Sequence, residues 1–184
     1  MPLLDPIIIL TANYCVALLF LLACCGKLSA FSAFRATLEE YELLPKVVNT
    51  LVAAAIVVIE ASIVVAACVP ASANVAMFAA AVLLTIYASA IGVNLLRGRR
   101  DIDCGCTGPA RRQLLSGWLV LRNLSLVGLA LIGACVANHR VLQSADFALI
   151  GIALLGAMSL YAAINQLMVN APRLDALDAI MDAG

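Results

Sequence analysis

Five long apolar segments run through the chain, separated by shorter stretches in which the polar and charged residues gather. The five segments are residues 7–26, 47–69, 74–96, 117–138 and 147–169. Each is long enough to cross a bilayer as a helix, which takes about 20 mostly apolar residues. Only Glu60 and Arg122 place a charge inside a segment. The pattern therefore predicts an all-α, polytopic membrane helix bundle of five transmembrane helices, in which the first four spans form a four-helix core.

The composition agrees with a protein that lies in lipid. Hydrophobic residues make up 65% of the 184 residues and charged residues 12%, and the mean hydropathy is +1.08. An ordinary soluble domain has about 25% charged residues. The basic residues lie beside apolar spans, where membrane topology explains them, so we expect membrane lipid and no nucleic acid as a partner. We predict one membrane domain over residues 1–169 and a separate tail over residues 170–184.

Two polar segments beside the spans have amphipathic spacing. In residues 27–46, aromatic and apolar side chains recur at helical spacing with glutamates between them, which predicts a surface helix that ends near Pro45. The tail, residues 170–184, sets apolar positions against aspartates in the same way. We expect the tail either to be a frayed surface helix or to dock a partner.

The basic residues are divided unequally between the two ends of the predicted bundle. With five spans, the first loop, the third loop and the C-terminus share one membrane face, and that face holds ten basic residues against only Arg140, beside His139, on the other. Cytoplasmic loops are enriched in Lys and Arg. We therefore predict a periplasmic N-terminus and a cytoplasmic C-terminus. The ten residues are Lys27, Arg35, Lys46, Arg97, Arg99, Arg100, Arg111, Arg112, Arg122 and Arg173.

The residues most indicative of chemistry are two cysteines in the third loop, within the sequence Asp103-Cys104-Gly105-Cys106. A disulfide between Cys104 and Cys106 closes a very small ring, in which Gly105 permits backbone angles that other residues avoid. A strained disulfide is easily reduced, which is typical of an exchanging pair rather than a structural crosslink. Nearby arginines favour the reactive thiolate and nearby aspartates oppose it, so the net effect stays open.

Two other interpretations of this pair stay open beside thiol exchange. A structural zinc ion requires four ligands, and the loop has neither a histidine nor a second cysteine pair, so we predict no metal site. The two cysteines would otherwise be inert thiols. We expect Cys104 and Cys106 to exchange a disulfide with a partner, and the sequence does not indicate which of them attacks.

The other five cysteines lie in or at the ends of apolar spans. Cys24 and Cys25 end the first span on the same membrane face as the third loop, where they either form a redox relay with it or fill apolar space. Cys68 and Cys135 end two spans at the opposite face, and Cys15 lies in mid-span. These three outline a hypothetical relay across the membrane.

Glu60 lies near the middle of the second span, where an ionisable side chain is costly and is a functional candidate by default. It would either relay protons or bind a quinone headgroup, or it would be held protonated or paired by Asn13, Asn94 or Arg122. At the start of the fourth span, Trp118 and Arg122 fit an interfacial anchor followed by a basic side chain that reaches back to the membrane surface.

Six short motifs along the first four spans occur together in a known family. In order they are Gly26-Lys27-Leu28, Tyr41-x-Leu43-Leu44-Pro45, Glu60, Asn94-x-x-Arg97-Gly98-Arg99, Asp103-Cys104-Gly105-Cys106-x-Gly108 and Trp118-x-x-x-Arg122-Asn123. Taken together, they make residues 7–138 resemble the MauE family of methylamine-utilisation membrane proteins, which is related to the DoxX-like group. Thr107 stands where the family pattern has an aromatic residue.

The resemblance implies a multi-pass protein of the bacterial inner membrane. It implies a periplasmic thioredoxin-like partner of the MauD type, and an indirect role in maturation of the disulfide-rich light subunit of methylamine dehydrogenase. The resemblance also implicates Cys104 and Cys106 in thiol exchange. Glu60, Arg122 and Asn123 match positions of the family motifs to which the resemblance assigns no role.

The expected partner is periplasmic, whereas the charge bias places the third loop in the cytoplasm. A carrier that accepts reducing equivalents from cytoplasmic thioredoxin and passes them outward reconciles the two, and it needs no bound cofactor. One alternative is a dithiol oxidase with the loop outside, coupled to quinone as cofactor. Another is a non-catalytic scaffold that docks partners through the tail and residues 27–46.

Overall fold

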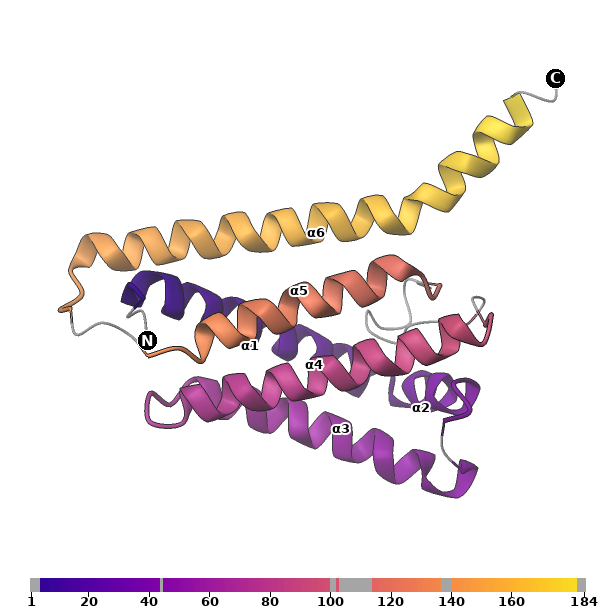
Figure 1. The fold of residues 1–184 in the computed structure, drawn as a ribbon, viewed down its shortest axis with the longest axis horizontal. Helices are drawn as coiled ribbons and strands as arrows, with labels where there is room; N and C mark the ends of the chain where they lie inside the picture. The colour runs from indigo at the N-terminus through magenta and orange to yellow at the C-terminus, as the bar shows by residue number, and fades with distance from the viewer. Residues whose placement is uncertain (1–3, 44, 100–101, 103–113, 137–139, 182–184) are drawn as a thin grey trace.

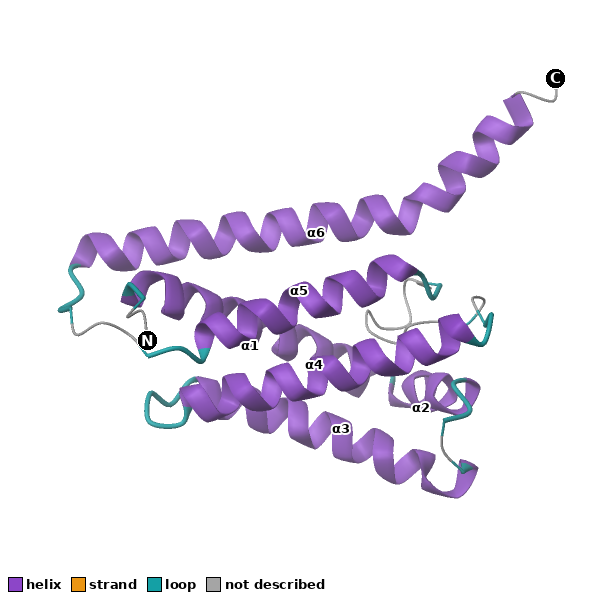
Figure 2. Ribbon diagram, viewed as in Figure 1, coloured by secondary structure: helices purple, strands orange, loops and turns teal. Residues whose placement is uncertain are grey.

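The computed structural model describes residues 4–43, 45–99, 102, 114–136 and 140–181, and it describes side chains up to residue 170 with the exception of residue 46. This part of the chain folds into helices joined by short loops (Figures 1 and 2), which confirms the predicted helical membrane bundle. The helices are α1 (Pro6–Ser29), α2 (Phe31–Glu40), α3 (Lys46–Ala67), α4 (Ala73–Leu96), α5 (Gly117–Gly133) and α6 (Ser144–Met181).

Four of these helices, α1, α3, α4 and α6, are long and apolar enough to cross a membrane, and α5 is a shorter apolar helix. Residues 117–138 were predicted as one span, but α5 ends at Gly133 and has 17 residues. At 1.5 Å per residue it is about 25 Å long, less than the roughly 30 Å hydrocarbon core. The apolar residues that follow Gly133 carry no strong stop signal, so hydropathy alone overestimates the helix.

Local chemistry explains where two of the long helices begin and end. Asp5 caps α1, because its Oδ1 accepts a hydrogen bond from the backbone N–H of Ile7 at 2.9 Å, and Pro6 occupies the first turn, where it needs no N–H partner. Gly98 follows the end of α4 and has a φ of +76°, a backbone conformation that glycine adopts readily and residues with a Cβ atom avoid. The backbone N–H of Gly98 then donates to Leu95 O, which satisfies one of the last free carbonyls of the helix.

The core lies between α1, α3, α4 and α5, as predicted for the first four spans. Its buried residues include several alanines, and Ala80 and Ala130 are fully buried where α4 and α5 face the bundle interior. A Cβ atom added at Gly133 would lie 3.2 Å from the Met77 side chain and 3.4 Å from the backbone nitrogen of Asn13. Small residues of this kind let helices approach closely in lipid, where packing drives helix association.

Helix α2 is shorter than the predicted surface helix of residues 27–46, because α1 continues to Ser29 and α2 ends at Glu40. It packs across the end of the bundle at which α3 begins. Phe34 on α2 is buried in a cluster with Cys24, Ala53 and Val57. Just after α2, Tyr41 packs in a second cluster with Ile91, Leu115 and Leu119. This end of the bundle therefore joins α2 to the end of α4 and the start of α5, the two helices that the third loop connects.

Helix α6 lies along the outside of the bundle, against α1 (Figure 1). It has 38 residues and runs without interruption through the position where we placed the boundary between the last span and the tail. Its C-terminal part bends away from the bundle (Figure 1). Pro172 lies in that part and lacks the N–H of a regular helical turn, so we attribute the bend to it.

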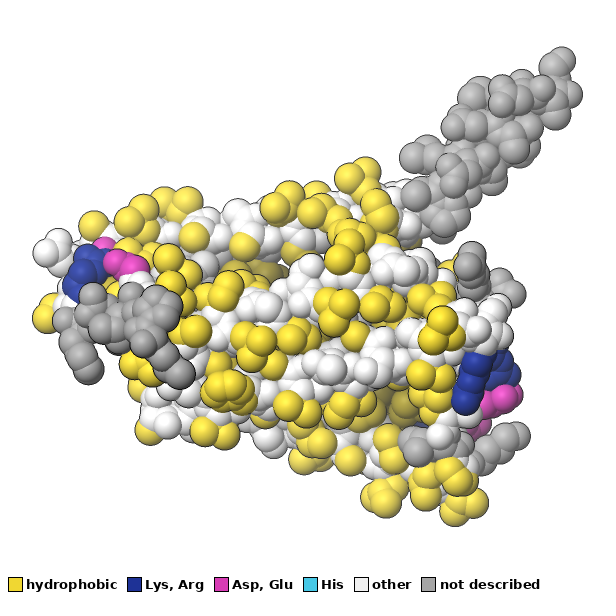
Figure 3. Space-filling view, viewed as in Figure 1, with side chains coloured by type: hydrophobic (Ala, Val, Ile, Leu, Met, Phe, Trp, Pro, Cys, Tyr) yellow, Lys and Arg dark blue, Asp and Glu magenta, His cyan; other side chains and the backbone are white. Residues whose placement is uncertain are grey.

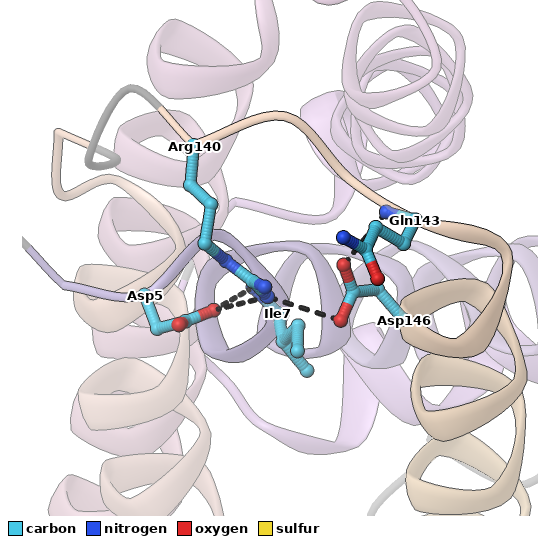
Figure 4. A network of polar contacts seen from close by, with 5 residues as sticks. All are labelled: Asp5, Ile7, Arg140, Gln143 and Asp146. Carbon is cyan, nitrogen blue, oxygen red and sulfur yellow. Dashed lines mark hydrogen bonds and ion pairs between the residues drawn. The ribbon is translucent and has the colours of Figure 1, made fainter.

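Charged side chains fix the start of α6 to the start of α1 (Figure 4). Arg140 Nη2 lies 3.0 Å from Asp146 Oδ1 and 3.6 Å from Asp5 Oδ1, so one guanidinium joins the two helix starts. Asp146 also accepts a hydrogen bond from the backbone N–H of Gln143 at 2.8 Å. The hydrogen bond that the Arg140 guanidinium donates to Asp146 raises the pKa of Arg140, so this link is charged at every physiological pH.

The described surface has the distribution expected for a membrane protein. In the face drawn in Figure 3, hydrophobic side chains cover the length of the bundle, whereas Lys, Arg, Asp and Glu side chains lie at its two ends. Large apolar side chains such as Val58, Val82 and Leu155 are well exposed along the middle of their helices. Contiguous apolar surface on this scale suits lipid contact rather than water.

Candidate functional site: a buried ion pair and its cavity

The predicted exchange pair, Cys104 and Cys106, lies outside the described residues. The structure does describe the helices that the loop joins: α4 ends at Leu96 and α5 begins at Gly117. Ile102, within the loop, packs in the cluster of Tyr41 and Leu119, and its carbonyl accepts a hydrogen bond from the backbone N–H of Leu115. The loop therefore starts and ends at the α2 end of the bundle.

Glu60 on α3 forms a buried ion pair with Lys27 in the last turn of α1. Lys27 Nζ lies 2.5 Å from Glu60 Oε1, and the side chains of the two residues are 4% and 1% exposed. The hydroxyl of Tyr87 on α4 donates a second hydrogen bond to the same oxygen at 2.7 Å. The pair therefore links three helices of the core.

The partners of Glu60 correct the sequence prediction. One of the two alternatives left open by the sequence had Asn13, Asn94 or Arg122 holding this carboxyl, and the structure gives it Lys27 and Tyr87 instead. We had counted Lys27 as a charge at the membrane surface because it follows an apolar span. A mid-span carboxylate needs a nearby counter-charge, and that requirement was the signal in the sequence that would have pointed to Lys27.

Two aromatic rings enclose the Lys27 ammonium beside its carboxylate partner. Nζ lies 5.4 Å from the ring centres of both Phe34 on α2 and Tyr87 on α4. Aromatic faces attract a cation at this distance, and the attraction strengthens when water is excluded. Lys27 is thus held in the interior by one carboxylate and two rings rather than extended to the membrane surface.

The second carboxylate oxygen of Glu60, Oε2, takes no part in these contacts. Within the described residues, Glu60 Oε2 is buried and has no hydrogen-bond partner, whereas Oε1 has two. A buried acceptor without a donor costs roughly 1–3 kcal/mol, and more when it is charged. Such a group commonly marks a place for a bound molecule or water.

A cavity lies directly beside this pair. Its volume is about 240 Å³, and its wall includes polar side chains from four core helices: Lys27 and Glu60, Tyr87 on α4, and Arg122 and Asn123 on α5. The rest of its wall is mostly apolar and comes largely from α1, with Tyr161 on α6 at one side. The helices thus bring together Glu60, Arg122 and Asn123, which the sequence had suggested only as separate motif positions.

Arg122 and Asn123 hold their places in this wall through described hydrogen bonds. Arg122 is 7% exposed, and its Nη1 donates to Asn165 Oδ1 of α6 at 3.1 Å. The prediction that Arg122 reaches back to the membrane surface is therefore wrong, because α6 covers it. Asn123 is also buried, and its Nδ2 donates to Leu119 O at 3.0 Å.

Cys24 and Cys25, the predicted relay residues, point in different directions near the same end of the bundle. Cys24 is buried between α1 and α3, with its Sγ 3.8 Å from Val57 O, whereas Cys25 is exposed. Both are free thiols. The position of Cys24 suits packing, and a redox role for the two residues stays a prediction.

Comparison with known proteins places this arrangement in a family. A family model described as methylamine utilisation protein MauE matches residues 5–136. The chain is 39% identical over 129 residues to methylamine utilization protein MauE of Paracoccus denitrificans, covering 70% of this chain and 69% of that protein. It is 32% identical over 169 residues to the protein of the same name from Methylophilus methylotrophus, covering 91% and 89%.

A third relative of that name, from Paracoccus versutus, is 36% identical over 127 residues, which are 69% of this chain and 68% of that protein. No solved structure matches the chain. The matched region contains the whole four-helix core, the ion pair and the loop with Cys104 and Cys106. The chain belongs to the MauE family of methylamine utilisation proteins.

Proposed function

We propose that this protein exchanges a disulfide between its own Cys104–Cys106 pair and a thioredoxin-like partner of the MauD type. In this way it would support maturation of the disulfide-rich light subunit of methylamine dehydrogenase in the inner membrane. The single observation that carries the proposal is the Cys-Gly-Cys sequence in a loop between two helices of a membrane bundle. Membership of a methylamine utilisation family supports the choice of process.

The chemistry runs through one mixed disulfide. The thiolate of one cysteine attacks a partner disulfide, an S–S bond forms between the two proteins, and the partner releases one thiolate. The second cysteine, as thiolate, then attacks the mixed disulfide. This step leaves Cys104–Cys106 oxidised and the partner with two thiols, so two electrons and two protons pass to the partner. A dithiol of the thioredoxin class on the same membrane face as the loop restores the reduced pair by the reverse sequence of steps.

The surroundings of the loop favour exchange with a visiting protein. The chain before and after the pair is held by packing around Tyr41, Ile91 and Leu119, which fixes the place where the loop leaves the bundle. Arg99 lies there as well, with its charge paired, since its Nη2 lies 2.7 Å from Glu42 Oε1. The sequence adds Arg100, Arg111 and Arg112 to the same loop, and nearby cations of this kind stabilise thiolates and attract an acidic partner surface.

Replacement of both loop cysteines tests the proposal. We expect Cys104→Ser/Cys106→Ser to abolish light-subunit maturation in cells that grow on methylamine, with normal amounts of the membrane protein. Of the two single serine variants, the one that keeps the attacking cysteine should accumulate a mixed disulfide with the partner, because it lacks the cysteine that resolves this bond. Thr107→Ser is the matched control, because it changes a neighbouring residue of the same loop without removing a thiol.

Unimpaired maturation in the double variant would refute exchange. It would favour the second candidate, a non-catalytic scaffold for the maturation machinery. The exposed length of α6 is the observation that supports this candidate, since α6 packs mainly against α1 and few of its described side chains are buried. Deletion of residues 170–184 should then abolish maturation, whereas an exchange protein should tolerate the deletion.

A further inference from the structure

The cavity beside Glu60 opens toward lipid rather than toward water. Its α1 wall includes Leu22, which is 56% exposed on the side of a membrane-spanning helix, and Leu19, which is partly exposed. On the far side, Tyr161 of α6 contributes to the wall. The exposed side chain of Leu22 therefore places one edge of the cavity at the lipid-facing surface of α1.

The size of the cavity suits one substituted six-membered ring. An apolar cavity of about 150 Å³ in a protein interior holds benzene, and this cavity has about 240 Å³. Val16, Phe20, Leu84 and Leu126 line its apolar part. The space is therefore wider than benzene needs, and its walls would cover the faces of a ring and the beginning of an apolar tail.

The polar part of the cavity wall offers both a hydrogen-bond donor and a hydrogen-bond acceptor, so a ligand that both accepts and donates hydrogen bonds fits it best. Glu60 Oε2 is a buried acceptor with no partner among the described residues. Lys27 carries three N–H donors and gives one of them to Glu60 Oε1. A hydroxyl on the ligand would satisfy the free carboxylate oxygen, and a ligand oxygen would accept from the ammonium.

The net charge of the cavity wall further limits the classes of ligand that can bind. Two cationic side chains, Lys27 and Arg122, and one carboxylate, Glu60, line the cavity, so an amine ligand would meet a net positive wall. A phosphate diester or a fatty-acid carboxylate is attracted by that charge but has no donor for Glu60 Oε2. A neutral ring with oxygens at opposite ends meets both demands.

We propose that this cavity binds the ring of a membrane quinone or quinol. The carbonyl or hydroxyl oxygen at one end of the ring accepts from Lys27, and the hydroxyl of the quinol form donates to Glu60 Oε2. The ring lies against the apolar wall, and its tail leaves toward lipid past Leu22. This binding depends on the ion pair and the cavity, and it stands independently of the exchange at Cys104 and Cys106.

Direct binding measurements test the proposal on the purified full-length protein in detergent. The probes are ubiquinone with one isoprene unit and its reduced quinol form, measured by isothermal titration calorimetry. We expect saturable binding of one molecule per chain, and tighter binding of the quinol because it alone supplies the hydroxyl donor. The same binding in a Cys104→Ser/Cys106→Ser background would separate this site from the proposed exchange chemistry.

Two matched pairs of variants locate the ligand. Ala23→Phe places a ring inside the cavity and should abolish binding, whereas Ala55→Phe, on the exposed face of α3, should leave it unchanged. Glu60→Gln should weaken quinol binding about tenfold or more, as expected for the loss of a hydrogen bond to a charged group. Glu39→Gln, at an exposed ion pair, is its control.

Three outcomes would overturn the proposal. The first is no saturable binding of either probe, which would mean a cavity filled by water alone. The second is binding that Ala23→Phe leaves intact, which would place the quinone elsewhere. The third is complete displacement of the probe by an equimolar amount of oleate, which would make the cavity a general lipid site.

Discussion

The buried Lys27–Glu60 pair predicts a large and asymmetric response to substitution. Lys27→Met removes the counter-charge and leaves a carboxylate that is fully buried and bonded only to Tyr87. Breaking a buried ion pair from one side costs about 3–5 kcal/mol, because the remaining charge loses its compensation. We expect Lys27→Met to lower the free energy of unfolding by this amount.

Glu60→Gln should cost less than Lys27→Met. The remaining ammonium keeps the rings of Phe34 and Tyr87 at 5.4 Å, and each such contact contributes about 0.5–2 kcal/mol. Lys27 also lies in the last turn of α1, near the membrane surface, to which a long side chain can extend. We expect a loss of about 2–3 kcal/mol.

The double variant Lys27→Met/Glu60→Gln distinguishes pairing from packing. With both charges gone, the interior holds two side chains of similar size, and neutral replacements of buried pairs are often harmless. We expect the double variant to lose about 0–2 kcal/mol, so the coupling energy of the cycle is at least about 3 kcal/mol. Arg35 and Glu39, an exposed pair on α2, supply a control cycle that should give below about 0.5 kcal/mol.

Equilibrium unfolding in mixed micelles with increasing sodium dodecyl sulfate provides the measurement. Trp118 is the single tryptophan of the chain and reports unfolding by its fluorescence. The reasoning would be refuted if Lys27→Met cost less than about 1 kcal/mol, or if the two single losses simply added in the double variant. Either result would mean that the two charges do not compensate each other in the folded protein.

Three further predictions concern other parts of the chain. Gly133→Leu should destabilise the core by about 1–3 kcal/mol in the same unfolding assay, because the new side chain meets Met77 at van der Waals contact or closer. Arg140→Gln should lower the thermal midpoint slightly at low salt and have no effect in about 1 M salt, where charges are screened within about 3 Å. A membrane-impermeant thiol reagent should label Cys104 and Cys106 only after permeabilisation of the cells, and rapid labelling of intact cells would reverse the predicted orientation.

Hydropathy predicted most of the fold because lipid imposes a simple requirement. A helix that crosses the bilayer must be apolar over about 20 residues, so α1, α3 and α4 are visible in the sequence within a few residues of their ends. The start of α6 is visible in the same way, whereas its end at Met181 lies beyond the apolar span. Helix α2 was predicted from the periodicity of its aromatic residues. The end of α5 was missed, because a helix that stops inside an apolar stretch leaves no mark in hydropathy.

The site was harder to predict, because it depends on which helices become neighbours. Glu60 was recognisable in the sequence as a charged residue in the middle of a span. Its partner, Lys27, comes from the end of another helix, where a lysine is expected at the membrane surface. The cavity needs walls from five helices, and spacing along one chain says nothing about such a junction. The exchange of disulfides by Cys104 and Cys106 stays a prediction from sequence.

The burial of two basic residues bears on the predicted orientation of the protein. Lys27 is neutralised by Glu60, and Arg122 is covered by α6, so neither belongs in a count of charges at the membrane surface. Removing both leaves eight basic residues on the face of the third loop against Arg140 on the other. Arg140 is itself paired with Asp5 and Asp146. Because the rule counts basic residues in short loops near the membrane, the bias still favours a cytoplasmic third loop. Under that orientation Lys27, in the last turn of α1, lies nearer the cytoplasmic face, and a protein that exchanges with Cys104 and Cys106 would approach from that face.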